Sequence, residues 1–112
     1  MARNVLPLSH YEADMVLMPV RHGETKMVAA MRIVVFGPNF PQRAIEPELL
    51  VGEAIARHTS IAGDQRSIRG YFFDVPADGD AIRVRYGDSQ EGELRERFSR
   101  HTIRPIPKDC QG

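Results

Sequence analysis

Arginine side chains are the groups in this sequence best suited to hold an anion. Arg83 and Arg85 lie on one face of the alternating segment 81–86, and Arg95 and Arg97 follow within fifteen residues. A guanidinium can hold a phosphate or a carboxylate through two parallel hydrogen bonds, so these four arginines are candidate anion-binding residues. The alternative is a solvated face, which neighbouring acids would neutralise: Asp80, Asp88, Glu91, Glu93 and Glu96.

The hexapeptide Val20–Thr25, VRHGET, resembles the phosphohistidine loop of the histidine phosphatase and phosphoglycerate mutase family. The resemblance implies that His22 attacks phosphorus and that Arg21 binds the transferred group. The family fold is a larger α/β domain, whereas strand and helix patterns do not alternate after this motif. The sequence therefore favours a polar hairpin loop, with a phosphate-class enzyme that uses His22 and Arg21 as the alternative.

The sequence indicates no cofactor and no metal site. The four histidines show no His-x-His spacing, and the aspartates between positions 74 and 88 do not match the twelve-residue calcium loop. The P-loop and the glycine signature of dinucleotide-binding proteins are also missing. Cys110 is the single cysteine, so a disulfide within the chain is excluded and no role is assigned to this thiol.

Composition narrows the class of protein. The 112 residues suit one domain, and 42% hydrophobic with 27% charged residues is typical of a globular protein. A net charge of zero argues against general affinity for nucleic acids or anionic membranes. The longest apolar run, Met27–Phe36, is too short to span a membrane, and residues 1–11 do not form a secretory signal. We therefore expect a cytoplasmic protein without a membrane partner.

Four stretches have the pattern of β-strands, namely residues 14–20, 27–36, 68–75 and 81–86. Segments rich in glycine, proline or aspartate separate them about every 11–16 residues, a spacing typical of a small β-sandwich. Residues 47–58 and 93–100 are ambiguous, because each fits either extended chain or a short helix. The predicted class is all-β, with a short helix possible in those two segments.

The stretch 37–88 resembles the IPT/TIG domain, an immunoglobulin-like β-sandwich. The apolar strand Ile33–Phe36 runs into the turn Gly37-Pro38-Asn39-Phe40, and Val51-Gly52 and the Val/Arg-rich segment Ile82–Tyr86 follow in the family's order. The resemblance favours strands over a helix in residues 47–58. If the fold is of this kind, the core contains Ile33, Val35, Phe40, Val51, Ile55, Ile68, Phe72, Ile82 and Val84.

These observations predict one β-sandwich over residues 14–107, with a loose N-terminal arm at 1–13 and a C-terminal tail at 108–112. Members of the resembled family serve as binding parts of larger proteins. We therefore expect a non-enzymatic binding or assembly module. An exposed edge strand would bind a protein partner or a second copy of the chain.

Overall fold

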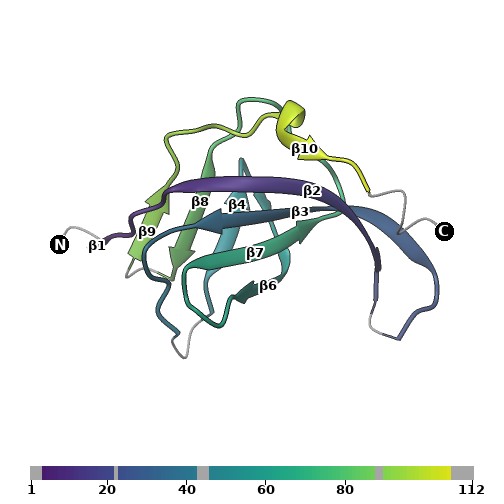
Figure 1. The fold of residues 1–112 in the computed structure, drawn as a ribbon, viewed down its shortest axis with the longest axis horizontal. Helices are drawn as coiled ribbons and strands as arrows, with labels where there is room; N and C mark the ends of the chain where they lie inside the picture. Colours follow the sequence, from purple (N-terminus) through teal and green to yellow (C-terminus); the bar gives the residue numbers. More distant parts are fainter. Residues whose placement is uncertain (1–3, 22, 43–45, 88–89, 107–112) are drawn as a thin grey trace.

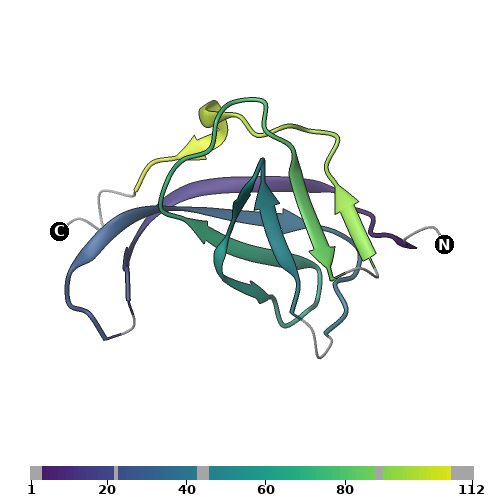
Figure 2. The same ribbon diagram turned by 180° about the vertical axis from the view of Figure 1, so that it is seen from behind.

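The computed structural model describes residues 4–21, 23–42, 46–87 and 90–106. Two five-stranded sheets pack face to face, which confirms the predicted all-β sandwich (Figures 1 and 2). Helical structure within these residues is limited to one 3-10 turn, η1 (Arg100–Thr102). In this part of the chain, no helix has the length and apolar character needed to cross a membrane.

The first sheet is built around one long antiparallel hairpin, β2 (His10–Pro19) and β3 (Met27–Phe36). Every residue of β2 has a partner in β3, from His10 opposite Phe36 to Pro19 opposite Met27. The other strands of this sheet are β6 (Arg57–Ile61), β7 (Ser67–Phe72) and β10 (Ile103–Arg104). Their order is β10-β2-β3-β7-β6, so β3 is the central strand, as its apolar sequence predicted.

The second sheet has the order β1-β9-β8-β4-β5. Its strands are β1 (Asn4–Val5), β4 (Glu48–Val51), β5 (Ala54–Ile55), β8 (Ile82–Tyr86) and β9 (Gln90–Glu93). The neighbouring pairs β9–β8, β8–β4 and β4–β5 are antiparallel, whereas β1 runs parallel to β9. Between β5 and β6 the chain passes from this sheet to the first through a single residue, Ala56.

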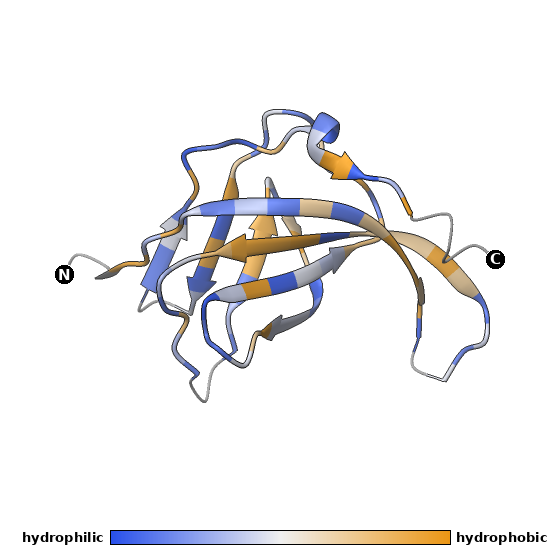
Figure 3. Ribbon diagram, in the orientation of Figure 1, coloured by the Kyte–Doolittle hydropathy of each residue, from blue (hydrophilic) through white to orange (hydrophobic). Residues whose placement is uncertain are grey.

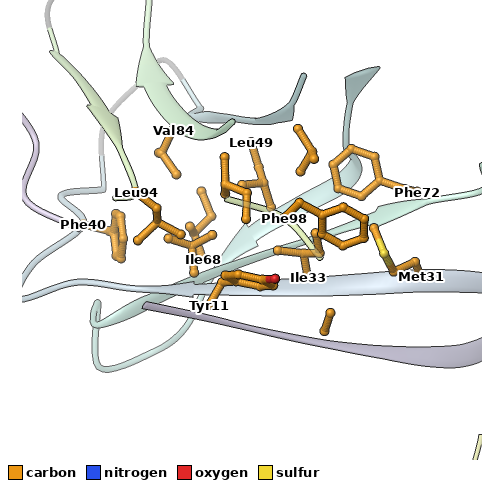
Figure 4. Packing of buried hydrophobic residues seen from close by; sticks show 14 of the residues in the cluster. Tyr11, Met31, Ile33, Phe40, Leu49, Ile68, Phe72, Val84, Leu94 and Phe98 are labelled. Atoms are coloured by element: carbon orange, nitrogen blue, oxygen red, sulfur yellow. The ribbon is translucent and has the colours of Figure 1, made fainter. Parts of the chain in front are cut away.

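The core fills the space between the sheets, as Figure 4 shows. Strand alternation places Ile82, Val84 and Tyr86 of β8 inward and leaves the intervening arginines half-buried. Of the nine predicted core residues, eight are buried: Ile33, Val35, Phe40, Val51, Ile68, Phe72, Ile82 and Val84. The prediction was wrong for Ile55, which is 52% exposed because β5 is a two-residue strand at the sheet edge.

Phe40, which the sequence predicted to be a core residue, closes one end of the core. Its side chain is fully buried, and its backbone N–H donates to the carbonyl of Gln65 at 2.7 Å. Gly37, at the start of this turn, donates to Arg66 at 3.0 Å. A Cβ on Gly37 would lie 2.8 Å from the carbonyl oxygen of Pro7, so the turn needs glycine at this position.

Residues 47–58 and 93–99 contain no helix, and Arg100, the last residue of the second ambiguous segment, begins the 3-10 turn η1. Residues 48–55 make the hairpin β4–β5, which turns at Gly52 with a φ of +61°. Beyond β9, Leu94 donates to the carbonyl of Ile82 and Phe98 to that of Asp80, both at 2.9 Å. These bonds tie the 93–100 segment to β8 and the preceding turn, and bury Leu94 and Phe98 in the core.

Strand β2 begins before the apolar run at Asp14 that marked it in the sequence. Tyr11 and Ala13 are buried, so this part of the expected loose arm belongs to the sheet. The Tyr11 hydroxyl accepts a hydrogen bond from the backbone of Ser99 at 3.0 Å and lies 2.9 Å from the hydroxyl of Thr102. Tyr11 thus fastens the C-terminal segment to β2. The predicted tail, with Cys110, lies outside the described residues.

Candidate functional site

The VRHGET motif forms the tip of the β2–β3 hairpin, where the sequence predicted a loop between two strands. Gly23 has a φ of +86°, and the backbone N–H of Glu24 donates to the carbonyl of Arg21 at 3.2 Å. Arg21, Glu24 and Thr25 are exposed, so an anion at this tip would stay in contact with water. His22 lies outside the described residues, and its catalytic role stays a prediction.

The four candidate anion-binding arginines occupy two settings. Arg83 and Arg85 project from the outer face of β8, and each is already ion-paired. Arg83 Nη1 lies 3.3 Å from Glu91 Oε1, and Arg85 Nε lies 2.9 Å from Glu48 Oε1. Of these two acids, Glu91 is one that the sequence named for a neutralised face, whereas Glu48 is brought to Arg85 by the pairing of β4 with β8.

Arg95 and Arg97 follow β9 in the segment that has no regular structure, and both are exposed. Arg97 Nη1 donates to the carbonyl oxygen of Gly79 at 3.1 Å, which ties it to the turn before β8. The Arg97 guanidinium is therefore hydrogen-bonded to the backbone of a turn, whereas those of Arg83 and Arg85 are ion-paired with glutamates. Anion binding by these four residues stays a prediction.

Two of the three histidines in the described residues, His10 and His58, contact aromatic rings. His10 stacks on Phe36 with ring centroids 4.5 Å apart and an interplanar angle of 8°. His58 meets the edge of Tyr71 at 6.4 Å between centroids. Within the part of the chain that the structure describes, no three histidine, cysteine, aspartate or glutamate side chains are grouped so that they could hold a metal ion.

The feature that strand patterning did not reveal is the far half of the β2–β3 hairpin. We call Val16–Pro19 of β2, together with their partners Met27–Ala30 of β3, the distal hairpin. Figure 1 shows this ribbon reaching beyond the other strands and curving away from the sandwich. It contributes to the elongated shape of the molecule, which measures 51 × 30 × 25 Å.

Both outer edges of the distal hairpin lack a strand partner among the described residues. On one side, β10 pairs with β2 only at Ala13 and Asp14. On the other side, β7 pairs with β3 no farther along than Met31. The backbone groups that face outward along these edges can therefore pair with another strand.

All residues of the distal hairpin are apolar, and because side chains of a strand alternate, both of its faces are apolar. Orange bands mark several of these residues on the ribbon of Figure 3. Leu17 is 43% exposed and Met27 is 49% exposed. Two methionines, Met18 and Met27, belong to it, whereas the adjoining Met31 is fully buried and Met15 packs against the core. Methionine is flexible and polarizable, so it adapts readily to the surface of a partner.

A groove of about 600 Å³ runs beside the β2 edge of the distal hairpin. Its walls are mostly apolar, and the lining residues are Asp14, Met15, Val16, Leu17, Met27, Arg32 and Ile106. Asp14 and Arg32 form a two-point ion pair, with distances of 3.0 Å from Nε to Oδ1 and 2.5 Å from Nη2 to Oδ2. Hydrogen bonding to the Asp14 carboxylate raises the pKa of Arg32 above its ordinary value.

A second apolar surface lies near β5. A shallow cavity of about 200 Å³ is lined there by Ala54, Ile55, Arg57, Tyr71, Phe72, Phe73 and Asp74. The Arg57 guanidinium lies 5.2 Å from the centroid of the Phe73 ring. The guanidinium already covers one face of the Phe73 ring. This surface therefore leaves less apolar area open to a partner than the distal hairpin does.

One signal in the sequence could have identified the distal hairpin. Strands of ten residues are long for a small sandwich, where five or six are common. The run from Met15 to Val20 also lacks the polar alternation of a strand that has one solvated face. Together these features indicate a hairpin that extends past its sheet.

Comparison with known proteins assigns neither a family nor a function to the chain. No family model matches the chain, and no curated protein and no solved structure matches it either.

Proposed function

We propose that this protein is a non-enzymatic binding or assembly module whose contact element is the distal hairpin. The observation that carries the proposal is a protruding apolar ribbon, of which neither edge has a strand partner in the described residues. Natural sheets usually protect such edges with charges, bulges or covering segments. Proline serves the same purpose, and Pro19 stands at the end of β2; from Met15 to Met18 the β2 edge carries neither a charge nor a proline, and a partner strand would complete it there.

The architecture supports an immunoglobulin-like form of the sandwich. Immunoglobulin strands are lettered A to G along the chain, and here the letters go in that order to β2, β3, β4, β6, β7, β8 and β9. The first sheet then has the order A-B-E-D and the second sheet the order G-F-C. This is the order of strands in immunoglobulin domains, where β5 would be an extra strand beside C. The turn Gly37–Phe40, with its buried phenylalanine, is consistent with the narrower IPT/TIG resemblance.

The mode of contact that fits this element is strand addition. In that mode, backbone hydrogen bonds supply affinity and alternate side chains supply specificity. A partner strand laid along β2 would place its side chains beside Leu17 and in the groove next to it. The partner is therefore a protein with an extended apolar segment, and the sequence-based prediction of a cytoplasmic location is compatible with it.

The proposal is tested by photo-crosslinking in the cells that express the protein. A photoreactive phenylalanine analogue replaces Leu17 in one variant and Ile55 in the other, since both side chains are exposed apolar residues of strands. We expect protein adducts from position 17 and few from position 55. Equal yields at the two positions, or adducts from position 55 alone, would remove the distal hairpin as the contact element.

A further inference from the structure

We infer that the outer face of β7 binds a short stretch of single-stranded nucleic acid, at a surface separate from the distal hairpin. Strand β7 lies between β3 and β6 in the first sheet, as Figure 1 shows. Ile68 and Phe72 of β7 are buried against the core, so strand alternation turns Arg69 and Tyr71 outward. Phe73 follows β7 directly and is half-buried. A guanidinium group and aromatic rings therefore follow one another along this face.

Strand β6 adds a second cation and another ring to this face. Arg57 lies opposite Tyr71 in the sheet, so the two side chains project from the same side. The Arg57 guanidinium lies 5.2 Å from the centroid of the Phe73 ring, and the His58 ring meets the edge of the Tyr71 ring. Arg57, His58 and Arg69 are all exposed, so cations and rings are grouped around a half-buried tyrosine at the surface of the sheet.

The positive charge of this surface is not neutralised by acids. The two acids that β2 carries on the same face, Glu12 and Asp14, are each paired with an arginine outside β6 and β7. Among the described residues, neither Arg57 nor Arg69 has a carboxylate within ion-pair distance. Arg69 Nε donates instead to the hydroxyl of Ser60 at 3.2 Å. The chain as a whole is neutral, but this half of the face keeps two positive charges available to an anion.

A hollow lies at each end of β7, and each hollow borders an aromatic ring. One, of about 490 Å³, is lined by Ser9, Phe36, Gly37, Pro38 and Arg66. The other is the cavity of about 200 Å³ beside Tyr71 and Phe73. From Ser67 to Phe73 the strand spans about 20 Å, which is the length of about three to four extended nucleotides. The two hollows are therefore placed to receive bases from one short strand.

The alternation of rings and guanidinium groups favours single-stranded nucleic acid over other anions. Unpaired bases stack on aromatic side chains, and arginines hold the phosphates between them with little dependence on sequence. An acidic peptide has the charge but no flat bases to place on Phe36 and Tyr71. A duplex keeps its bases covered, and two arginines match few of its phosphates. Asp64 and Asp74, both exposed beyond the ends of β7, would repel a longer strand and limit the site to a few nucleotides.

The number of arginines sets the expected strength and salt dependence of binding. Each phosphate of a single strand that is neutralised contributes about −0.7 to the slope of log Kobs against log salt, so two arginines give a slope of about −1.4. We expect a dissociation constant on the order of 10–100 µM at low salt, within the range of non-specific binding.

Fluorescence anisotropy of labelled hexanucleotides, one of thymidine and one of uridine, tests the inference with the full chain. Arg69→Gln should weaken binding about three- to tenfold and bring the salt slope toward about −0.7. Lys26→Gln is the matched control, because it removes one positive charge from an exposed position outside this face, and it should bind like the wild type.

Binding of either hexanucleotide with this pattern supports the inference, and the two probes together show whether the 2′-hydroxyl contributes. No binding by the wild type up to about 1 mM would overturn it, and so would equal losses in Arg69→Gln and Lys26→Gln. A hexaglutamate peptide or a DNA duplex that bound as tightly as the hexanucleotides would also overturn it, in favour of a generic anion site.

Tyrosine emission tests the stacking directly. The chain has no tryptophan and three tyrosines, and of these Tyr11 and Tyr86 are buried. A base stacked on Tyr71 should therefore quench part of the protein emission, in parallel with the anisotropy change. Tyr71→Phe should bind within about twofold of the wild type but lose the quenching, whereas Tyr71→Leu should weaken binding at least about fivefold. Urea denaturation confirms that both variants fold. Quenching that persists in Tyr71→Phe, or wild-type binding by folded Tyr71→Leu, would overturn the inference.

Discussion

The two halves of the β2–β3 hairpin differ in sequence pattern and in surroundings, since β2 alternates polar and apolar residues in the basal half and is wholly apolar in the distal half. The basal half, His10–Asp14 with Arg32–Phe36, lies against the second sheet and is flanked by β10 and β7. Ile33 and Val35 of this half are fully buried. The distal half continues the same two strands past these neighbours, and Leu17 and Met27 are about half exposed there.

The difference shows that apolar residues on one strand can serve two purposes. Burial of a large apolar side chain contributes roughly 1.5–3 kcal/mol to folding, and only the basal half gains this from the sandwich. The distal half keeps its apolar surface available for a partner. Single substitutions in the basal half should therefore lower the free energy of unfolding, and those in the distal half should weaken binding to a partner.

The largest effect is expected from Phe40→Ala, in the core cluster that covers the basal half. Phe40 is fully buried, so loss of its ring should lower the free energy of unfolding by about 3–5 kcal/mol. Urea denaturation followed by circular dichroism measures this change. A midpoint equal to that of the wild type would show that the core is not packed around this ring.

A matched pair on β3 compares the two halves directly. Ile33→Ala, in the basal half, should cost about 2–5 kcal/mol of unfolding free energy, because the side chain is fully buried. Met27→Ala, in the distal half, should change it by less than about 0.5 kcal/mol. Dilute protein is used so that association does not contribute. Similar losses in the two variants would mean that both halves are equally packed.

A smaller effect is expected where the C-terminal segment is fastened to the basal half. Tyr11→Phe removes the hydroxyl that accepts from Ser99 and pairs with Thr102, and should cost about 1–2 kcal/mol. Hydrogen exchange should report faster exchange of the Ser99 amide and unchanged exchange in β8. An unchanged rate at Ser99 would contradict the fastening role of Tyr11.

The smallest effect is expected at the junction between the two halves. Asp14→Asn weakens the ion pair with Arg32, and since both side chains are about one-third exposed the loss should be about 0.5–1 kcal/mol. The loss should shrink in high salt. Because hydrogen bonding to Asp14 raises the pKa of Arg32 above its ordinary value, the arginine stays charged and its contribution is constant across neutral pH.

Glu12→Gln is the control for that variant, because the Glu12–Arg104 pair is more exposed and should contribute almost nothing. If Glu12→Gln destabilised the protein as much as Asp14→Asn, the contribution of an ion pair would not depend on its exposure here. Thermal unfolding at low and high salt distinguishes these results.

Sequence alone determined the architecture. Turn residues at regular spacing predicted two layers of short strands, and strict alternation predicted which side of β8 faces the core. Phe40 could be placed as a plug because an apolar ring between two prolines cannot continue a strand and must be covered. These features depend on neighbours in sequence, which the chain itself displays.

Tertiary contacts decided the rest. The pairs Glu93–Arg97 and Glu96–Arg100 have the spacing of an α-helix, yet residues 93–99 are not helical, because Leu94 and Phe98 donate hydrogen bonds to backbone carbonyls at and just before β8. Ile55 has the residue type of a core position but lies at a sheet edge. The boundary between basal and distal hairpin depends on where β7 and β10 end, far away in sequence. A strand's own residues set its alternation, whereas its burial depends on which distant segments pack against it.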